Sequence, residues 1–188
     1  ISNELCSLRP HEDKLTYSCV FQMSEKGELK SSWVGRTVTH SNHRFTYEDV
    51  QQVIESGNGL YHKEVLLLNK LAQQMRSARM KAGAINFSSQ EVRFRLDEKG
   101  MPIGILVKES KESHQLIEEF MLLANRTVAE KVSKVKVSGK PIPFPYRIHD
   151  QPDEEKLIPF VEFARKHGYH FKTNTPEEIA GSFNEMLL

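Results

Sequence analysis

Residues 116–127 read LIEEFMLLANRT, and this stretch decides what the chain can fold into. In an α-helix, which turns about 100° per residue, its apolar positions share one broad face that suits packing on a core. Those positions are Leu116, Phe120, Leu123, Ala124 and Thr127. The sequence therefore predicts a long helix from about Glu112 to Lys136.

Glu118 and Asn125 lie almost in line on the opposite side of this helix, with Met121 and Leu122 as apolar flanks. A carboxylate and an amide among apolar neighbours suit a partly buried polar site that orients a hydroxyl, a water or a metal-bound group. The same pattern also suits an ordinary solvated helix face with two scattered apolar residues. The sequence leaves both interpretations open.

The residues before this helix predict a hairpin and two further helices. β-rich residues over 15–21 and 33–38 flank a glycine turn, which is typical of an antiparallel hairpin. Thr46 precedes acidic and then apolar residues, so a short helix is expected from Tyr47 to the glycines at 57 and 59. Apolar residues at helical spacing over 60–83 predict a long helix next.

A second hairpin, with one face exposed to solvent, is expected between the two long helices. Apolar and charged residues alternate over 91–96, and a Lys-Gly turn leads to the apolar residues of 103–107. Residues 138–145 contain one glycine and three prolines, which excludes regular helix or a central strand there. The last predicted elements are an extended piece at 146–149, a helix from Pro152 or Asp153 to His167, and a helix from Pro176 onward.

The predicted order of elements is ββ, α, α, ββ, α, β, α, α, with no internal repeat. This order indicates an α+β fold, with antiparallel hairpins packed against several long helices, and a single unit over residues 1–188. Hydrophobic residues make up 38% of the 188-residue chain, which is enough for a core.

The overall charge gives little sign of a polyanionic partner, because 26 Lys and Arg face 25 Asp and Glu, for a net charge of +1. Two stretches carry a local basic excess, one from Lys131 to Lys140 and one at Arg76, Arg79 and Lys81. Each can contact phosphates, and each can equally be a solvated helix end.

Two cysteines, Cys6 and Cys19, are too few for a four-ligand zinc site or a disulfide framework, so a reducing cytoplasm is expected. No apolar run approaches about 18 residues, so we expect no spanning helix and no membrane partner. The chain begins at Ile1 and ends on two leucines, which suggests a segment excised from a longer protein.

No motif in the sequence indicates a catalytic centre that is complete within this chain. The chain has no phosphate-binding glycine loop, no nucleophile elbow and no Asp-x-Asp cluster, and its closely spaced histidines lack partner ligands. Tyr47 and Phe87 fall at or near connecting regions, where an aromatic side chain can stack on a nucleic-acid base or belong to the core.

Several short motifs nevertheless follow one another in a recognisable order. They are Leu5–Pro10 with Asp13–Leu15, His43–Tyr47, Gly83–Phe87, Ile117–Asn125 and Tyr146–Asp150. In this order they resemble the catalytic domain of the RNB exoribonucleases, the ribonuclease II and ribonuclease R family, and most of all its bacterial ribonuclease R branch. The resemblance covers essentially the whole chain, and its strongest motif is Glu-Glu-x-Met-x-x-Ala-Asn at 118–125.

The resemblance implies that the parent protein hydrolyses RNA processively from the 3′ end, requires Mg²⁺ and releases nucleoside 5′-monophosphates. In that family an aspartate cluster upstream of the matched segment holds two ions, and a Thr-Ser-Pro-Ile-Arg-Arg motif lies downstream of it. Two such ions supply the largest electrostatic contribution to cleavage. We therefore expect residues 1–188 alone to bind no Mg²⁺ appreciably and to be inactive.

The resemblance also implies the site residues. Tyr47 matches a tyrosine that packs on the 3′-terminal nucleotides and sets the length of the final product, and Phe87 matches a phenylalanine that stacks from the opposite side. Glu118 matches a catalytic-site glutamate that bonds the sugar hydroxyl of the 3′ nucleotide, with Glu119 as the alternative carrier of this role. The implied partner is single-stranded RNA, whose 2′-hydroxyl distinguishes it from DNA.

Two other hypotheses remain. The chain can belong to a catalytically dead relative that only binds RNA or a protein, or it can be a purely structural α+β domain. The sequence gives no indication of an oligomeric state.

Overall fold

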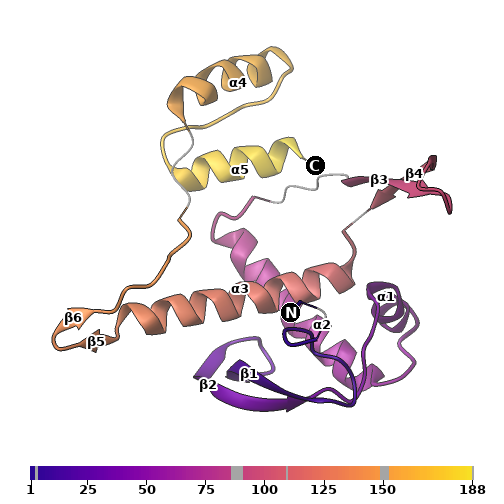
Figure 1. Cartoon of the computed structure of the whole chain (residues 1–188). Coiled ribbons are helices and arrows are strands. Elements are labelled where there is room, and N and C mark those ends of the chain that lie inside the picture. Colours follow the sequence, from indigo (N-terminus) through magenta and orange to yellow (C-terminus); the bar gives the residue numbers. More distant parts are fainter. Residues whose placement is uncertain (3, 86–90, 109, 149–152, 188) are drawn as a thin grey trace. The chain divides into compact units, whose positions relative to one another are not determined.

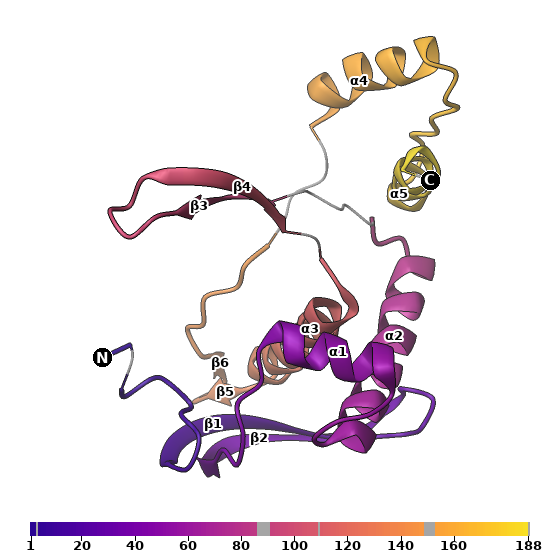
Figure 2. The same ribbon diagram turned by 90° about the vertical axis from the view of Figure 1, so that its right-hand side faces the viewer.

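The computed structural model describes residues 1–2, 4–85, 91–108, 110–148 and 153–187. Within these residues five helices and three two-stranded antiparallel sheets make an α+β fold, as predicted (Figures 1 and 2). The single unit expected over residues 1–188 stays a prediction, and the contacts within the chain group it into two compact units. The first comprises Ile1–Met75 and Lys111–Pro145, and the second comprises Arg76–Ser110 and Tyr146–Leu188. No helix in the described residues is long and apolar enough to cross a membrane.

The first unit opens with the predicted hairpin, in which β1 (Asp13–Met23) pairs with β2 (Leu29–His40). Gly27 closes its turn at a φ of 77°, a conformation that glycine adopts without a steric penalty. Four hydroxyl side chains on one face bond one another across the strands, with O···O distances of 2.6–2.7 Å. They belong to Thr16, Ser18, Thr37 and Thr39.

Strand β2 also carries Trp33, the single tryptophan of the chain. Its ring lies so close over Gly35 that a Cβ atom at that position would come within 2.3 Å of it. Because no side chain fits in that space, the ring depends on a glycine two residues along the strand.

Helix α1 (Tyr47–Ser56) begins and ends as the sequence predicts. The Thr46 hydroxyl oxygen accepts a hydrogen bond from the Asp49 backbone N–H at 3.1 Å, and the Asp49 carboxylate accepts one from the Thr46 N–H at 3.0 Å. This reciprocal pair satisfies two N–H groups that a helix start leaves without partners. Gly57, at a φ of 68°, ends the helix in the left-handed conformation.

Helix α3 (Glu112–Ser133) and the greater part of α2 (His62–Lys81) complete the first unit. Helix α3 packs against α1, and the Gln51 side-chain oxygen accepts a hydrogen bond from the Ser113 backbone N–H at 3.1 Å. Helix α2 is tied to α3 by Asn69, whose Nδ2 donates to the Glu112 carboxylate at 2.6 Å. These bonds fix the start of α3 relative to α1 and α2.

Helix α3 ends at Ser133, before the predicted end near Lys136, because a small ribbon follows. Strands β5 (Lys136–Val137) and β6 (Lys140–Pro141) pair across Ser138 and Gly139, whose φ angles are 51° and 78°. Two positive φ values are typical of a tight hairpin turn, and the Pro141 ring lies at the edge of a minimal ladder. The prediction of a β element at 146–149 is wrong for residues 146–148, which the structure describes and which form no strand.

The second unit contains a hairpin and two helices at the predicted places. They are β3 (Glu91–Leu96), β4 (Pro102–Lys108), α4 (Glu154–Lys166) and α5 (Pro176–Met186). Its core joins the two helices through four buried residues, Val161, Ala164, Phe171 and Ile179. The β3–β4 hairpin was expected to expose only its charged face, but its apolar face is exposed too. Phe94 is 62% exposed, and its cross-strand partner Ile105 is 66% exposed.

Candidate RNA-binding site

The first unit contains a mainly apolar cavity of about 620 Å³ at the start of α1. Aromatic rings form part of its wall, since the His43 and Phe45 ring centroids are 4.3 Å apart and those of Phe45 and Tyr61 are 6.2 Å apart. Other lining residues include Tyr47, Val65, Leu68, Leu116 and Ile117. An open apolar cavity with aromatic rings suits a planar group such as a nucleobase.

Tyr47 is placed at this cavity by the first turn of α1. Its ring stacks on His114 of α3, with a centroid distance of 4.2 Å and an interplanar angle of 9°. The His114 ring is itself held, because its Nδ1 accepts a hydrogen bond from the Lys111 backbone N–H at 3.3 Å. Tyr47 remains 42% exposed, so it lies at the surface of the cavity and is not a core residue.

Helix α3 places the two adjacent glutamates in different surroundings. Leu116 and Ile117 line the cavity, and Glu118, next in sequence, is exposed. Glu119 is only 3% exposed. Glu118, not Glu119, therefore has the accessible carboxylate. Asn125, its predicted polar companion, is also exposed, so the pair lies on an accessible helix face.

Phe87, the third residue of the expected site, lies outside the described residues. Of the basic residues singled out in the sequence, Lys131 has a structural partner, since its Nζ donates to the Ser32 carbonyl of β2 at 2.5 Å. Lys134, Lys136 and Lys140 are exposed at the end of α3 and on the β5–β6 ribbon. The structure thus brings Tyr47 and the start of α3 together without joining these lysines to the cavity.

The described residues do not fit a metal site. Nowhere among them do three or more His, Cys, Asp or Glu side chains gather closely enough to hold an ion. Mg²⁺ favours carboxylate oxygen ligands together with water and phosphate. Nothing in the described part of this chain therefore supports a chemical step that runs through Mg²⁺.

Asp49 and Cys19 are among the titratable groups of this unit whose pKa values are clearly shifted. Hydrogen bonds from Thr46 hold the pKa of the Asp49 carboxyl below its usual value, which strengthens the cap of α1. Burial raises the pKa of the Cys19 thiol, and the nearby positive charge of Lys131 only partly opposes this. Cys19 is therefore a neutral thiol near pH 7 and lacks the thiolate that cysteine chemistry requires.

Sequence reasoning missed His114, whose ring stacks on Tyr47, and Tyr61 of the cavity wall. His114 lies four residues before Glu118, one helical turn away on the same face, so helical spacing was a signal that pointed to it. Tyr61 follows Gly59 in an irregular connection and has a φ of 54°. No periodic pattern marks its position.

An α+β fold with an aromatic cavity and an accessible carboxylate defines a class of candidate nucleic-acid-binding domains. The family expected from the motifs is confirmed by comparison. Residues 1–187 match the RNB domain, and the chain belongs to this family.

Two curated relatives illustrate the match. Ribonuclease R 2 of Lactococcus lactis is 31% identical over all of this chain and 30% of its own length. The human exosome complex exonuclease RRP44 is 34% identical over 98% of this chain and 19% of its own length. The chain thus spans less than a third of the relatives that it matches.

Solved structures of Mycoplasma genitalium RNase R also resemble the chain. The apo form has a TM-score of 0.84 at 27% identity and is matched over 98% of this chain and 29% of its own. Two further structures of that protein contain ribose methylated single-stranded RNA and double-stranded RNA, with TM-scores of 0.84 and 0.85. The likeness covers nearly all of this chain.

Proposed function

We propose that the longer protein containing this chain is a processive 3′→5′ hydrolytic exoribonuclease that releases nucleoside 5′-monophosphates. The observation that carries the proposal is the RNB match over residues 1–187, together with an aromatic cavity in the same chain. Residues 1–188 supply the part of the catalytic domain that holds the 3′ end of single-stranded RNA.

Tyr47 is the proposed stacking platform for the 3′-terminal nucleotides. Its exposed ring at the cavity mouth supports this role, because base stacking tolerates any base and suits an enzyme that acts on every nucleotide in turn. Phe87 is proposed to stack from the opposite side.

Glu118 is proposed to accept a hydrogen bond from the sugar hydroxyl of the 3′ nucleotide. Its exposure favours it over Glu119, whose buried side chain is inaccessible to a ligand. A carboxylate is acceptor-only and pairs naturally with a 2′-hydroxyl donor, which DNA lacks.

Mg²⁺ dependence is proposed for the longer protein, with the metal ligands supplied from outside the described residues. Residues 1–188 alone are expected to show no appreciable nuclease activity. A reducing cytoplasm is the proposed compartment.

The test is a cleavage assay on the full-length protein. A 5′-labelled single-stranded RNA is incubated with and without Mg²⁺, and products are separated by length and identified by chromatography. The proposal expects stepwise shortening and nucleoside 5′-monophosphates only when Mg²⁺ is present. RNA binding without any 5′-monophosphate would instead identify a catalytically dead relative that acts as a binding module.

A further inference from the structure

A second cavity of about 440 Å³ lies in the first unit and is lined by Ser7, Leu8, Arg9 and Arg44. The two arginines come from different segments, one before β1 and one between β2 and α1. A hydrogen bond holds these segments together, since the His11 backbone N–H donates to the Ser41 carbonyl at 2.7 Å beside a bridge between Pro10 and Ser41. The cavity therefore depends on the fold, which brings Arg44 to the segment that holds Arg9.

The charges at this cavity are poorly neutralised. Arg9 has one acidic partner, Glu4, at 3.8 Å, and both side chains are exposed, so this pair contributes little. Arg44 takes part in no hydrogen bond or ion pair within the part of the chain that the structure describes. Glu12, the next acid along the chain, is paired with Lys14 at 2.6 Å, and its pKa is lowered chiefly by this bond and to a smaller extent by the charge of Arg9. A net positive charge remains at the cavity.

The available donors suit a phosphate. The Ser7 hydroxyl already donates to the Ser2 carbonyl at 2.8 Å, so the two guanidinium groups supply the free N–H donors. Guanidinium groups present planar pairs of N–H donors that match phosphate oxygens, and they are never deprotonated near pH 7.

The position of Arg44 links this cavity to the aromatic one. His43, Phe45 and Tyr47 line the aromatic cavity, whereas Arg44 lines the arginine-lined cavity. One short segment thus presents aromatic rings to one cavity and a positive charge to the other. A single RNA strand has the same alternation, with stacking bases attached to a charged backbone.

We propose that Arg9 and Arg44 bind a backbone phosphate of single-stranded RNA whose 3′ end occupies the aromatic cavity. This inference rests on the proposed function for the identity of the ligand. It adds a binding site. The arginine-lined cavity would hold a phosphate within the RNA strand and not the phosphate that is cleaved.

The test measures binding of fluorescent oligo(A) to the full-length protein in EDTA, so that no cleavage contributes, over a series of salt concentrations. Each phosphate contact to a single strand contributes about 0.7 to the slope of log affinity against log salt. We expect the double variant R9A/R44A to bind about tenfold more weakly at low salt, with a slope shallower by about 0.7. The charge-conserving variant R9K/R44K should keep the wild-type slope.

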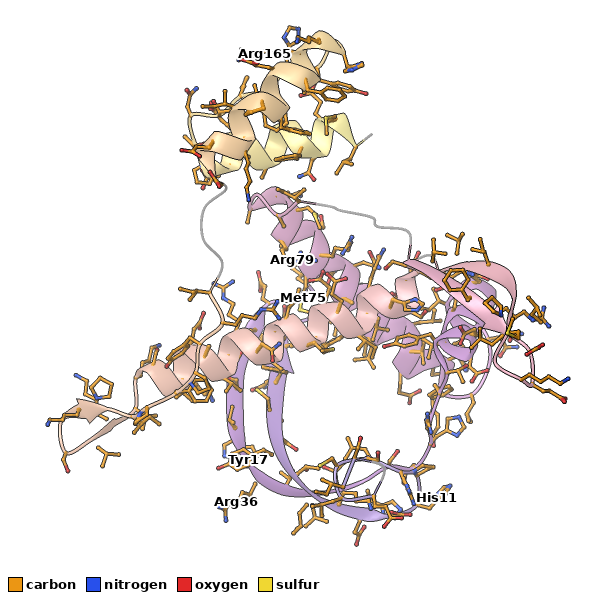
Figure 3. The ribbon with its side chains drawn as sticks, turned by 45° about the horizontal axis from the view of Figure 1, so that its top comes forward. His11, Tyr17, Arg36, Met75, Arg79 and Arg165 are labelled. Carbon is orange, nitrogen blue, oxygen red and sulfur yellow. The ribbon has the colours of Figure 1, made fainter. Side chains whose placement is uncertain are left out.

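The control is Arg36→Ala, which removes one exposed arginine of the first unit, whereas the double variant removes two. Arg36 points away from the curved β1–β2 ribbon and lines neither cavity (Figure 3). It should leave the slope unchanged. A double variant indistinguishable from this control, with an unchanged thermal midpoint, overturns the site.

Further outcomes separate the alternatives. If the wild type releases no 5′-monophosphate with Mg²⁺ but R9A/R44A still shows the shallower slope, the proposed activity fails and the phosphate site stands. If inorganic phosphate at constant ionic strength displaces RNA from the wild type and not from R9A/R44A, phosphate and RNA compete for the two arginines, which supports the site. If R9A/R44A loses phosphate binding but keeps the wild-type RNA affinity and slope, the cavity is a free-anion site and the assignment to the RNA backbone is overturned.

Discussion

The aromatic cavity and the arginine-lined cavity of the first unit share one segment of backbone but differ in chemistry. The aromatic cavity is about 620 Å³ and has stacked and edge-on rings in its wall, whereas the arginine-lined cavity is about 440 Å³ and carries two guanidinium groups. Stacking is nearly independent of salt, and phosphate binding is strongly weakened by it. A strand held by both should therefore respond to two separate kinds of substitution.

The largest expected effect comes from Tyr47→Ala, which removes the proposed stacking platform. Loss of one stacked base costs about 1–3 kcal/mol, equivalent to roughly 5- to 150-fold weaker RNA binding. The slope against salt should not change, in contrast to R9A/R44A. Fluorescence anisotropy in EDTA measures both quantities.

Two variants control this result. Tyr47→Phe retains the ring and should bind nearly as the wild type, and Tyr17→Ala removes an exposed tyrosine of the β1–β2 ribbon that lines neither cavity (Figure 3). If Tyr47→Ala binds RNA as tightly as Tyr17→Ala, Tyr47 does not stack on a base in the aromatic cavity.

The second expected effect concerns recognition of the sugar, which neither stacking nor phosphate binding provides. Glu118→Gln should reduce the preference for RNA over the matching DNA by about tenfold, because a hydrogen bond to a charged group contributes about 1.5–3 kcal/mol. The measurement is the ratio of the two dissociation constants in EDTA. The free energy of unfolding should stay the same, since Glu118 is exposed.

Glu119→Gln is the matched comparison on the neighbouring residue. Its side chain is 3% exposed, so the change should lower the free energy of unfolding by about 1–3 kcal/mol while leaving the RNA to DNA ratio unaltered. If Glu119→Gln changes the ratio and Glu118→Gln does not, the two roles are exchanged.

A third, smaller effect acts on both cavities at once. Thr46→Ala removes the cap of α1 and should cost about 1 kcal/mol of stability, seen as faster hydrogen exchange of the first-turn amides. Because Thr46 lies in the segment shared by the cavities, RNA binding should weaken in both its stacking and its salt-dependent parts. Thr46→Ser, which keeps the capping hydroxyl, should behave as the wild type.

The smallest expected effect is a dependence on pH. The pKa of Asp49 is lowered in the folded chain, so its contribution to stability is present above the ordinary Asp value of about 3.9 and is lost as pH falls through the folded value. Thermal midpoints measured from pH 6 to pH 2 should therefore fall less steeply in Asp49→Asn than in the wild type. Equal pH profiles for the two proteins would show that the pKa of Asp49 is not lowered by folding.

Local signals predicted most of the fold. Thr46 and Gly57 mark the ends of α1 in the sequence because capping groups and left-handed glycines act over a few residues. The hairpin at 136–141 was missed because prolines in 138–145 outweighed the Ser138-Gly139 turn signal, although a two-residue ladder tolerates Pro141 at its edge.

The candidate site was less predictable. Helical periodicity placed Glu118 opposite Leu116, and the structure agrees, since one is exposed and the other is 6% exposed. The pairing of Tyr47 with His114 and of Arg9 with Arg44 depends on contacts between segments distant in sequence. No pattern within either segment encodes such a contact.

The seating of Trp33 over Gly35 has a practical consequence. Because the chain has one tryptophan and it lies in β2, intrinsic indole emission reports on the β1–β2 ribbon alone. The α4–α5 pair, which has phenylalanines in its core, is silent at that wavelength. Emission and far-ultraviolet circular dichroism recorded in one melting experiment therefore compare the ribbon alone with the helices of both units together.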